Sequence, residues 1–285
     1  MTRIIYVNGY YHPYEQAGIH AEDRGFLFAD GVYEVCEVRA GRLIDERRHI
    51  ERLDRSMSEL RMKAPMSSRA FGVILRETVR RNRVRNGFVY LQVTRGTARR
   101  DFAFPSDETP CSVVCFAGTK SPEKAEKRAA RGIDVITMPD IRWKRVDIKT
   151  VGLLPNALAR QAALDAGADE AWLVDPSGHV TEGASCNAWI ITANGELITR
   201  PAEGSILRGI TRTVVIELIA KQGLNLVERA FTVDEAKAAQ EAFNTSATGL
   251  VMPVIAIDGT TIGRGKPGPL TMELRRAFHD FAETS

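Results

Sequence analysis

The sequence has few cysteines, no long apolar run and little net charge. Its 285 residues include four cysteines (Cys36, Cys111, Cys115 and Cys186), and they form no CxxC pair. This spacing favours reduced, buried thiols over a disulfide framework or a zinc site, so we expect no metal ion. The apolar runs are short and interrupted, and we therefore expect no membrane-spanning helix.

The first residues, "MTRIIYVNGYYHPYE", also lack the basic-then-apolar pattern of a secretory signal. We therefore expect a soluble, cytoplasmic protein. The formal net charge of +3 is too small to indicate nucleic-acid binding by itself. The segment 76–87, "RETVRRNRVRNG", is more basic. Apolar residues before and within it recur at helical spacing, which favours a solvated outer helix face; nucleic-acid binding through these arginines is the alternative from another functional class.

Neither repeats nor low-complexity tracts are present, and the first part of the chain mixes strands with two helices. Residues 45–62 carry Ile50, Leu53, Met57 and Leu60 at the spacing of one helix face. A second helix is expected to start after Ser67, a residue type that caps helix N-termini, and to end near residues 86–87. The stretches "FVYLQVTRG" and "CSVVCFAG" are rich in valine and aromatic residues and predict strands.

The polar segment 118–128, "GTKSPEKAEKR", predicts a linker. Short strands dominate after it, separated by turn signals such as "ANGE" and "IDGTT". Helices are expected at residues 155–166, 209–222, 233–240 and 269–282. The sequence thus predicts an α+β protein with a small α/β domain over residues 1–117 and a larger, strand-rich domain over residues 129–285.

A charged cluster, "DIRWKRVDIK", ends at Lys149, where a small-residue apolar run begins. As a strand, this stretch would place Trp143, Arg145, Asp147 and Lys149 on one face. A buried amine with cationic neighbours has a lowered pKa, and such a lysine is nucleophilic toward carbonyls. Schiff-base formation with an aldehyde cofactor is the chemistry that it would suit. Taken alone, the pattern also fits an ordinary surface lysine.

Three further features could bind parts of such a cofactor. A helix start near Gly209, in "LRGITR", would direct the N–H groups of Ile210 and Thr211 outward, which suits a phosphate. The loop "NTSATG" (244–249) offers more N–H and hydroxyl groups, and Arg52 could add positive charge. Glu182, in a turn within "HVTEGASCN", could pair with a pyridine nitrogen. Each feature also has an ordinary explanation as a helix start, a polar loop or a surface carboxylate.

The order of these motifs is more specific than any one of them. "EDRGFLFADGVYEV", "HIERL", "VTRG", "DIRWKRVDIKT", "VTEGASCN", "LRGITR" and "NTSAT" resemble the class IV pyridoxal-phosphate aminotransferases of fold type IV. That group includes D-amino-acid transaminases, branched-chain aminotransferases and aminodeoxychorismate lyase. The resemblance covers nearly the whole chain, and the first and fourth motifs are most similar to the D-amino-acid branch. It implies a small N-terminal α/β sandwich, a larger C-terminal pseudo-barrel, pyridoxal 5'-phosphate as cofactor and a homodimer.

The resemblance also implies roles for single residues. Lys149 matches the lysine that holds the cofactor as a Schiff base and shuttles the substrate proton, and Glu182 matches the acidic partner of the pyridine nitrogen. Tyr33 matches a tyrosine on the substrate side. The residues implied for the phosphate and the ring face are Arg52, Leu207, Ile210, Thr211, Ser246 and Ala247.

Two positions depart from the family pattern. The D-amino-acid branch binds the substrate carboxylate with an arginine and a histidine two positions later; here Arg100 is present, but Phe102 replaces the histidine and cannot donate a hydrogen bond. Ala247 stands where the phosphate site often has threonine, and Ser246 and Thr248 could substitute. The implied activity is ping-pong transfer of an amino group from a D-amino acid to a 2-oxo acid, and Phe102 motivates the alternative of an (R)-amine or branched-chain L-amino-acid transaminase.

Overall fold

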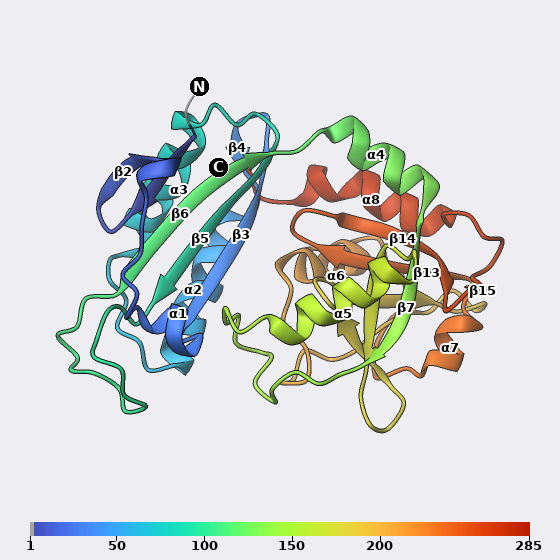
Figure 1. The fold of residues 1–285 in the computed structure, drawn as a ribbon. Helices are drawn as coiled ribbons and strands as arrows, with labels where there is room; N and C mark the ends of the chain where they lie inside the picture. Colours follow the sequence, from blue (N-terminus) through green and yellow to red (C-terminus); the bar gives the residue numbers. More distant parts are fainter. Residues whose placement is uncertain (1–2) are drawn as a thin grey trace. The chain divides into compact units, whose positions relative to one another are not determined.

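A computed structural model describes residues 3–285 (Figure 1). The chain divides into two compact units. Unit 1 contains the chain up to Ser121 together with Ile148–Gly152 and Glu283–Ser285, and unit 2 contains Pro122–Asp147 and Leu153–Ala282. Unit 1 therefore takes up the short segment that carries Lys149, although this segment lies far along the chain from its other residues.

Unit 1 is built on an antiparallel sheet with the strand order β2-β1-β6-β5-β3-β4. Helices α2 (Glu46–Glu59) and α3 (Ser68–Arg81) contact its strands (Figure 1). Side chains alternate along β3, so that one face of the sheet is buried and the other is half-exposed. The strands are β1 (Ile4–Val7), β2 (Tyr10–Pro13), β3 (Gly31–Arg39), β4 (Arg42–Leu43), β5 (Gly87–Thr94) and β6 (Ser112–Thr119); η1 (Tyr14–Gln16) and α1 (Arg24–Phe28) are short helices.

The two helices of unit 1 form as their sequences predict. Ile50, Leu53 and Met57 of α2 are buried in the core, and Leu60 packs against it. The hydroxyl of Ser67 accepts a hydrogen bond from the backbone N–H of Ala70 and so caps α3. Both predicted helices and the strands β5 and β6 are confirmed.

The arginines of α3 lie on its outer side and pair with carboxylates. Arg80 and Arg81 bind Glu77, and Arg76 binds Glu46. Exposed fractions of 72% for the side chain of Arg80 and 42% for that of Arg81 agree with the expected solvated face.

Unit 2 contains a mixed nine-stranded sheet with the order β12-β11-β10-β13-β14-β7-β8-β9, and β15 pairs with β14. The pairs β7–β8, β7–β14 and β11–β12 are parallel. Its strands are β7 (Ile133–Pro139), β8 (Glu170–Val174), β9 (Val180–Gly183), β10 (Asn187–Ile191), β11 (Leu197–Thr199), β12 (Leu226–Glu228), β13 (Glu241–Ser246), β14 (Leu250–Ile257) and β15 (Thr260–Thr261).

The helices of unit 2 cover this sheet. Helices α6 (Ile210–Lys221) and α8 (Pro269–Phe281) contact each other and also β13, and α8 contacts β14. Helix α5 (Leu154–Asp165) contacts β7 and β8, and α7 (Val233–Lys237) contacts β14. Two sheets with separate helices confirm the predicted α+β class. Within residues 3–285, no helix is both long and apolar enough to cross a membrane.

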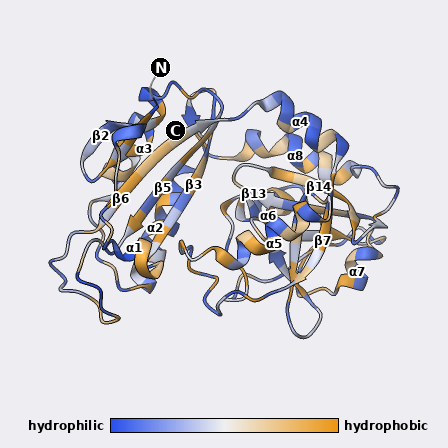
Figure 2. Cartoon of the chain, in the orientation of Figure 1, coloured by the Kyte–Doolittle hydropathy of each residue, from blue (hydrophilic) through white to orange (hydrophobic). Residues whose placement is uncertain are grey.

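Two predictions about local structure are wrong. Most of the expected linker 118–128 belongs to β6 or to helix α4 (Pro122–Arg131), whose surface is largely hydrophilic (Figure 2). Pro122 stands at the first helical position, where its missing N–H is tolerated, and Ala129 is buried. A polar composition thus described a surface helix rather than a linker. The division into domains at residues 1–117 and 129–285 stays a prediction.

The stretch 141–149 is not a strand in the described chain. The backbone N–H of Arg142 donates to the carboxylate of Asp140 at 3.1 Å, and this local hydrogen bond competes with strand pairing. A turn follows at Val146–Asp147, and Thr150 alone forms a β-bridge, to Val32. The predicted shared face of Trp143, Arg145, Asp147 and Lys149 therefore does not exist.

Candidate active site

Lys149 is held along strand β3 in unit 1. The N–H of Tyr33 donates to the carbonyl of Lys149 at 3.0 Å, and the N–H of Val151 donates to the carbonyl of Gly31 at 3.0 Å. The Nζ atom of Lys149 lies 4.2 Å from the centroid of the Tyr33 ring, and its backbone N–H donates to the hydroxyl of Ser56 at 3.4 Å. The chain on both sides of Lys149 is thus fixed, and the half-buried amine lies over an aromatic ring, which attracts its positive charge.

Arg52 forms a buried ion pair in the same unit. Its Nε and Nη2 atoms donate to the two oxygens of Glu34 at 2.7 and 2.8 Å, and Nδ1 of His49 lies 2.7 Å from Glu34 Oε2. Burial alone would raise the pKa of Glu34, but Arg52 and His49 hold it well below its usual range. Burial lowers the pKa of His49, with the charges of Arg52 and Lys149 adding to the effect. Arg52 is therefore a fixed cation whose orientation is set by Glu34.

Arg100 and Phe102 lie together on unit 1, against a third aromatic side chain. The guanidinium of Arg100 is 5.4 Å from the ring centroid of Phe28 and 5.7 Å from that of Phe102, and the two rings are 5.6 Å apart. The Phe102 side chain is 80% exposed. Its ring therefore contributes apolar surface beside the cation, where an imidazole would contribute a hydrogen-bond donor.

In unit 2, Glu182 lies in strand β9 rather than in the turn that follows it, and its carboxylate is only 5% exposed. Asn187 donates from Nδ2 to Glu182 Oε2 at 2.8 Å and to the carbonyl of Leu207 at 2.9 Å. The N–H of Leu207 lies 3.2 Å from both carboxylate oxygens, and Arg142 also donates to Glu182. The structure thus brings Glu182 and Leu207 together through Asn187.

Helix α6 begins after Gly209, as predicted. Glycine has no side chain that could cap the first turn, and the N–H groups of Ile210 and Thr211 lie at the positive end of the helix dipole. A side chain at position 209 would place its Cβ 2.1 Å from Oδ1 of Asn187, so only glycine fits this close approach. The side chain of Thr211 is 4% exposed. This helix start has the composition of an anion site.

The loop after β13 carries Ser246 and Ala247, both half-buried. The hydroxyl of Ser246 accepts a hydrogen bond from the N–H of Gly249 at 3.1 Å. Arg275 of α8, which is buried, donates to the carbonyls of Gly249 and Val251 at 2.9 and 2.8 Å. The loop is therefore held in a tight turn by a buried cation behind it.

Asn187 connects these parts of unit 2. It contacts Glu182 and Gly209, and its register partner in β13 is Thr245, the residue before Ser246. One residue thus borders a buried carboxylate, an uncapped helix start and a hydroxyl-bearing loop. This set fits a group with a basic ring nitrogen and an anionic substituent, as the resemblance implies for pyridoxal phosphate.

The predicted site residues form two groups. Lys149, Tyr33, Arg52, Arg100 and Phe102 belong to unit 1. The residues in unit 2 are Glu182, Leu207, Ile210, Thr211, Ser246 and Ala247.

Several residues of these networks were not predicted, notably Glu34, His49, Asp140, Arg142 and Asn187. Glu34 had a local signal, because it occupies a buried position in the alternation of β3. A carboxylate at such a position needs a cationic partner. Asn187 and Arg142 had none, since their partners lie 20 and 40 positions away along the chain.

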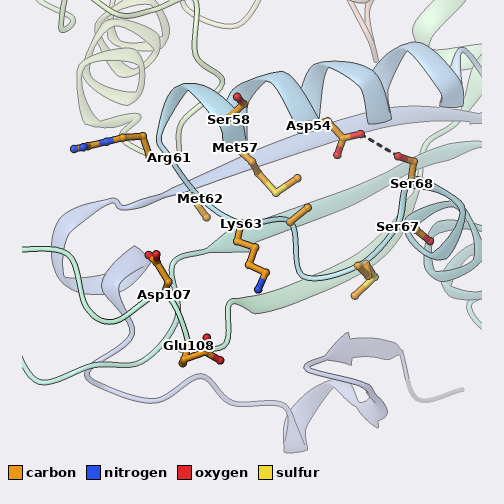
Figure 3. A pocket seen from close by; sticks show the side chains of 12 residues that line it. Asp54, Met57, Ser58, Arg61, Met62, Lys63, Ser67, Ser68, Asp107 and Glu108 are labelled. Atoms are coloured by element: carbon orange, nitrogen blue, oxygen red, sulfur yellow. Dashed lines mark hydrogen bonds between the residues drawn. The ribbon is translucent and has the colours of Figure 1, made fainter.

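A pocket of about 810 Å³ lies elsewhere in unit 1, beside the end of α2 (Figure 3). Met57 and Met62 lie along it, and Lys63, Asp107 and Glu108 supply charges. The site residues predicted from the sequence, all of which the structure describes, are not among those that line it. Among residues 3–285, no group of three or more His, Cys, Asp or Glu side chains could hold a metal ion.

Comparison with known proteins agrees with this geometry. The structure of a branched-chain amino acid aminotransferase from Escherichia coli matches the fold with a TM-score of 0.90 at 23% identity, covering 98% of this chain and 94% of the other. The enzyme of the same name from the organism T.th., solved with pyridoxamine 5'-phosphate, matches with a TM-score of 0.89 at 26% identity and the same coverage. The predicted fold type IV is therefore confirmed.

The family model described as amino-transferase class IV matches residues 31–257. A D-alanine aminotransferase from Bacillus licheniformis is 41% identical over 276 residues, which is 97% of this chain and 96% of the relative. Another, from Staphylococcus haemolyticus, is 36% identical over 285 residues, covering 100% of this chain and 99% of the relative. The chain belongs to the class IV aminotransferases.

Proposed function

We propose that this protein is a pyridoxal-phosphate-dependent transaminase that moves an amino group from a D-amino acid to a 2-oxo acid. The observation that carries this function is the similarity over the full chain to D-alanine aminotransferases, at 36% and 41% identity. The motifs "EDRGFLFADGVYEV" and "PDIRWKRVDIK" support the same branch. The substrates are thus small amino and keto acids.

The cofactor, when bound, supplies an aldehyde carbon for the substrate amine and an electron-withdrawing ring. The protein must then hold the ring, keep its nitrogen protonated and move one proton. Glu182 is the group that we assign to the ring nitrogen, and Leu207 to the ring face. The assignment of Glu182 is supported by its burial and by the donors that fix its carboxylate.

Anion binding is assigned to the start of α6, to the loop after β13 and to Arg52. Ile210 and Thr211 offer N–H groups at the positive end of the helix dipole, and Ser246 offers a hydroxyl. Ala247 supplies only its backbone. Glu34 keeps the guanidinium of Arg52 in one orientation, which suits a phosphate ligand.

Lys149 is assigned the covalent attachment of the cofactor and the proton transfer. Its backbone is tied to β3, and its Nζ atom lies over Tyr33, so a small reach is all that the amine must cover. An amine held in this way is a suitable general base for the α-proton of an amino acid. Tyr33 is assigned to the substrate side.

The carboxylate of the substrate is assigned to Arg100. The aromatic surface of Phe102 beside it favours a donor that presents an apolar group, and this observation keeps an (R)-amine or branched-chain L-amino-acid transaminase as the second candidate. Phe102 thus bears on which substrate is preferred rather than on the type of reaction.

The test uses purified protein incubated with pyridoxal phosphate. We expect a yellow protein whose absorbance band bleaches on addition of D-alanine, and no such protein-bound band in Lys149→Ala. Separate half-reactions with D-alanine, L-leucine and an (R)-aryl amine then rank the substrate classes. A protein that stays colourless with the cofactor would contradict the transaminase function, whereas bleaching by L-leucine alone would contradict only the D-specificity.

We further propose that the enzyme is a cytoplasmic homodimer. Exposed aromatic side chains support self-association, since Phe26 and Phe102 are 78% and 80% exposed. Light scattering after size exclusion tests this directly. A monomer at micromolar concentration, with full activity, would contradict the dimer.

A further inference from the structure

The carboxylate of Glu182 belongs to a buried chain of charges that extends away from it. Arg142 donates to Glu182 from Nη1, and donates to Asp140 from Nε at 2.9 Å and from Nη2 at 2.7 Å. The hydroxyl of Thr181 donates to Asp140 at 2.7 Å. The side chain of Arg142 is 7% exposed and that of Asp140 is 12% exposed. All of these residues lie in unit 2.

The charges in this chain do not cancel. Burial raises the pKa of Asp140, but Arg142 and Thr181 more than offset this, and its pKa lies below the usual value. Asp140 is therefore an anion at neutral pH, and Arg142 is a cation. Burial raises the pKa of the neighbouring Cys186 thiol, helped by the charges of Glu170 and Glu182, so this thiol is neutral. With Glu182 ionised, the sequence anion–cation–anion leaves one net negative charge.

One uncompensated negative charge in a buried site favours a cationic ligand group. A protonated pyridine nitrogen would make the set neutral. Without Asp140, Arg142 would cancel Glu182 by itself, and the site would no longer favour protonation of the ring.

We propose that Asp140 is a positioning residue that acts through Arg142: it neutralises this guanidinium so that Glu182 keeps its full charge for the ring nitrogen of the cofactor. This inference rests on the proposed function, because it requires that Glu182 faces that nitrogen. It adds two residues, Asp140 and Arg142, to the groups that set the protonation of the ring. Asp140 itself touches neither the cofactor nor the substrate.

The test measures the protonation of the ring nitrogen directly. The protein is freed of cofactor, loaded with ¹⁵N-labelled pyridoxal phosphate and titrated with pH while the ¹⁵N chemical shift is recorded. In Asp140→Asn the pKa of the ring nitrogen should fall by about one unit or more, the order of magnitude for removing one charge near a buried site. The matched control is Asp169→Asn, which breaks another ion pair of unit 2, with Arg131, and should leave the ring pKa unchanged.

A second variant separates charge from structure. Asp140→Asn/Arg142→Met removes both the anion and the cation, so that Glu182 again carries the only charge, and the pKa of the ring nitrogen should return toward the wild-type value. A purely structural role would make the double variant worse than the single one. A milder change, Thr181→Val, removes one donor to Asp140 and should shift the pKa in the same direction by less.

The outcomes distinguish this inference from the function on which it rests. If the wild-type protein does not bind the labelled cofactor, the proposed function fails. If it binds and Asp140→Asn titrates like wild type, or the double variant does not recover, the role of Asp140 is overturned and the function stands. Should Asp140→Asn prove unable to fold, Thr181→Val decides, and an unchanged ring pKa in that variant counts against the proposal.

Discussion

Glu34→Gln is the substitution that most directly tests whether the buried charge pairs hold this enzyme together. Glu34 is 2% exposed and binds both Arg52 and His49. Glutamine has nearly the same size, so the change removes a charge without opening a cavity. It leaves the guanidinium of Arg52, whose side chain is 9% exposed, without its counter-ion.

The expected loss is about 3 kcal/mol in the free energy of unfolding at neutral pH. Breaking a buried ion pair by neutralising one partner typically costs about 3–5 kcal/mol, because the other charge is then buried alone. The lower end applies here, since the amide oxygen of the introduced glutamine could still accept one of the two bonds that Arg52 donates to Glu34 at 2.7 and 2.8 Å. Two such bonds fix a guanidinium in its plane, and one does not.

Urea unfolding of the cofactor-free protein measures this difference. The matched control is Glu77→Gln, because Glu77 also binds two cationic side chains, Arg80 and Arg81, but at the surface. That variant should lose no more than about 1 kcal/mol. Equal losses in the two variants would refute the reasoning, since burial would then have no influence on the value of the pair.

Three further predictions concern other residues. Phe102→His adds a donor to the proposed carboxylate site and should raise turnover of D-alanine by up to roughly tenfold, the value of one charged hydrogen bond; an unchanged rate would place carboxylate recognition elsewhere. Burial lowers the pKa of His49, so below about pH 6.5 the unfolded chain binds a proton that the folded protein does not, and stability falls with the pH. His49→Gln should abolish this part, which amounts to at most about 1.4 kcal/mol per pH unit and is measured by urea unfolding at two pH values. Gly209→Ala forces Asn187 aside and should weaken binding of pyridoxal phosphate by roughly tenfold in equilibrium dialysis, whereas Gly18→Ala, which meets no neighbour, should not.

Local patterns predicted the parts of the fold that local forces determine. The spacing of Ile50, Leu53 and Met57 on α2 follows from one buried helix face, and Ser67 caps α3 through a bond to a residue only three positions away. The start of α6 at Gly209 was predictable for the same reason. Lys149 and Glu182 were assigned through the resemblance to a family, since their own surroundings were not visible in the sequence.

The errors and omissions have physical causes as well. Alternation predicted a strand before Lys149, but the bond from the Arg142 N–H to Asp140 bends this segment, and only Thr150 pairs with β3. The network around Glu182 could not be predicted, because Arg142 is 40 positions away from it and a buried arginine looks in the sequence like any surface arginine. Long-range pairs of this kind are specified by the packed fold.

Both groups of site residues use a buried guanidinium, and the charge balance differs between them. In unit 1, Arg52 has Glu34 as its ionised partner, so the pair is neutral while His49 is neutral. In unit 2, Arg142 lies between two carboxylates, and the set keeps a negative charge. The difference matches the ligand parts assigned to them: a neutral pair keeps an arginine in place for a phosphate, which its other donors and the helix start must attract, whereas a net negative set attracts a ring cation. A single charge substitution in either group therefore changes both the orientation and the field of the site, and a charge-balanced double substitution is needed to separate the two.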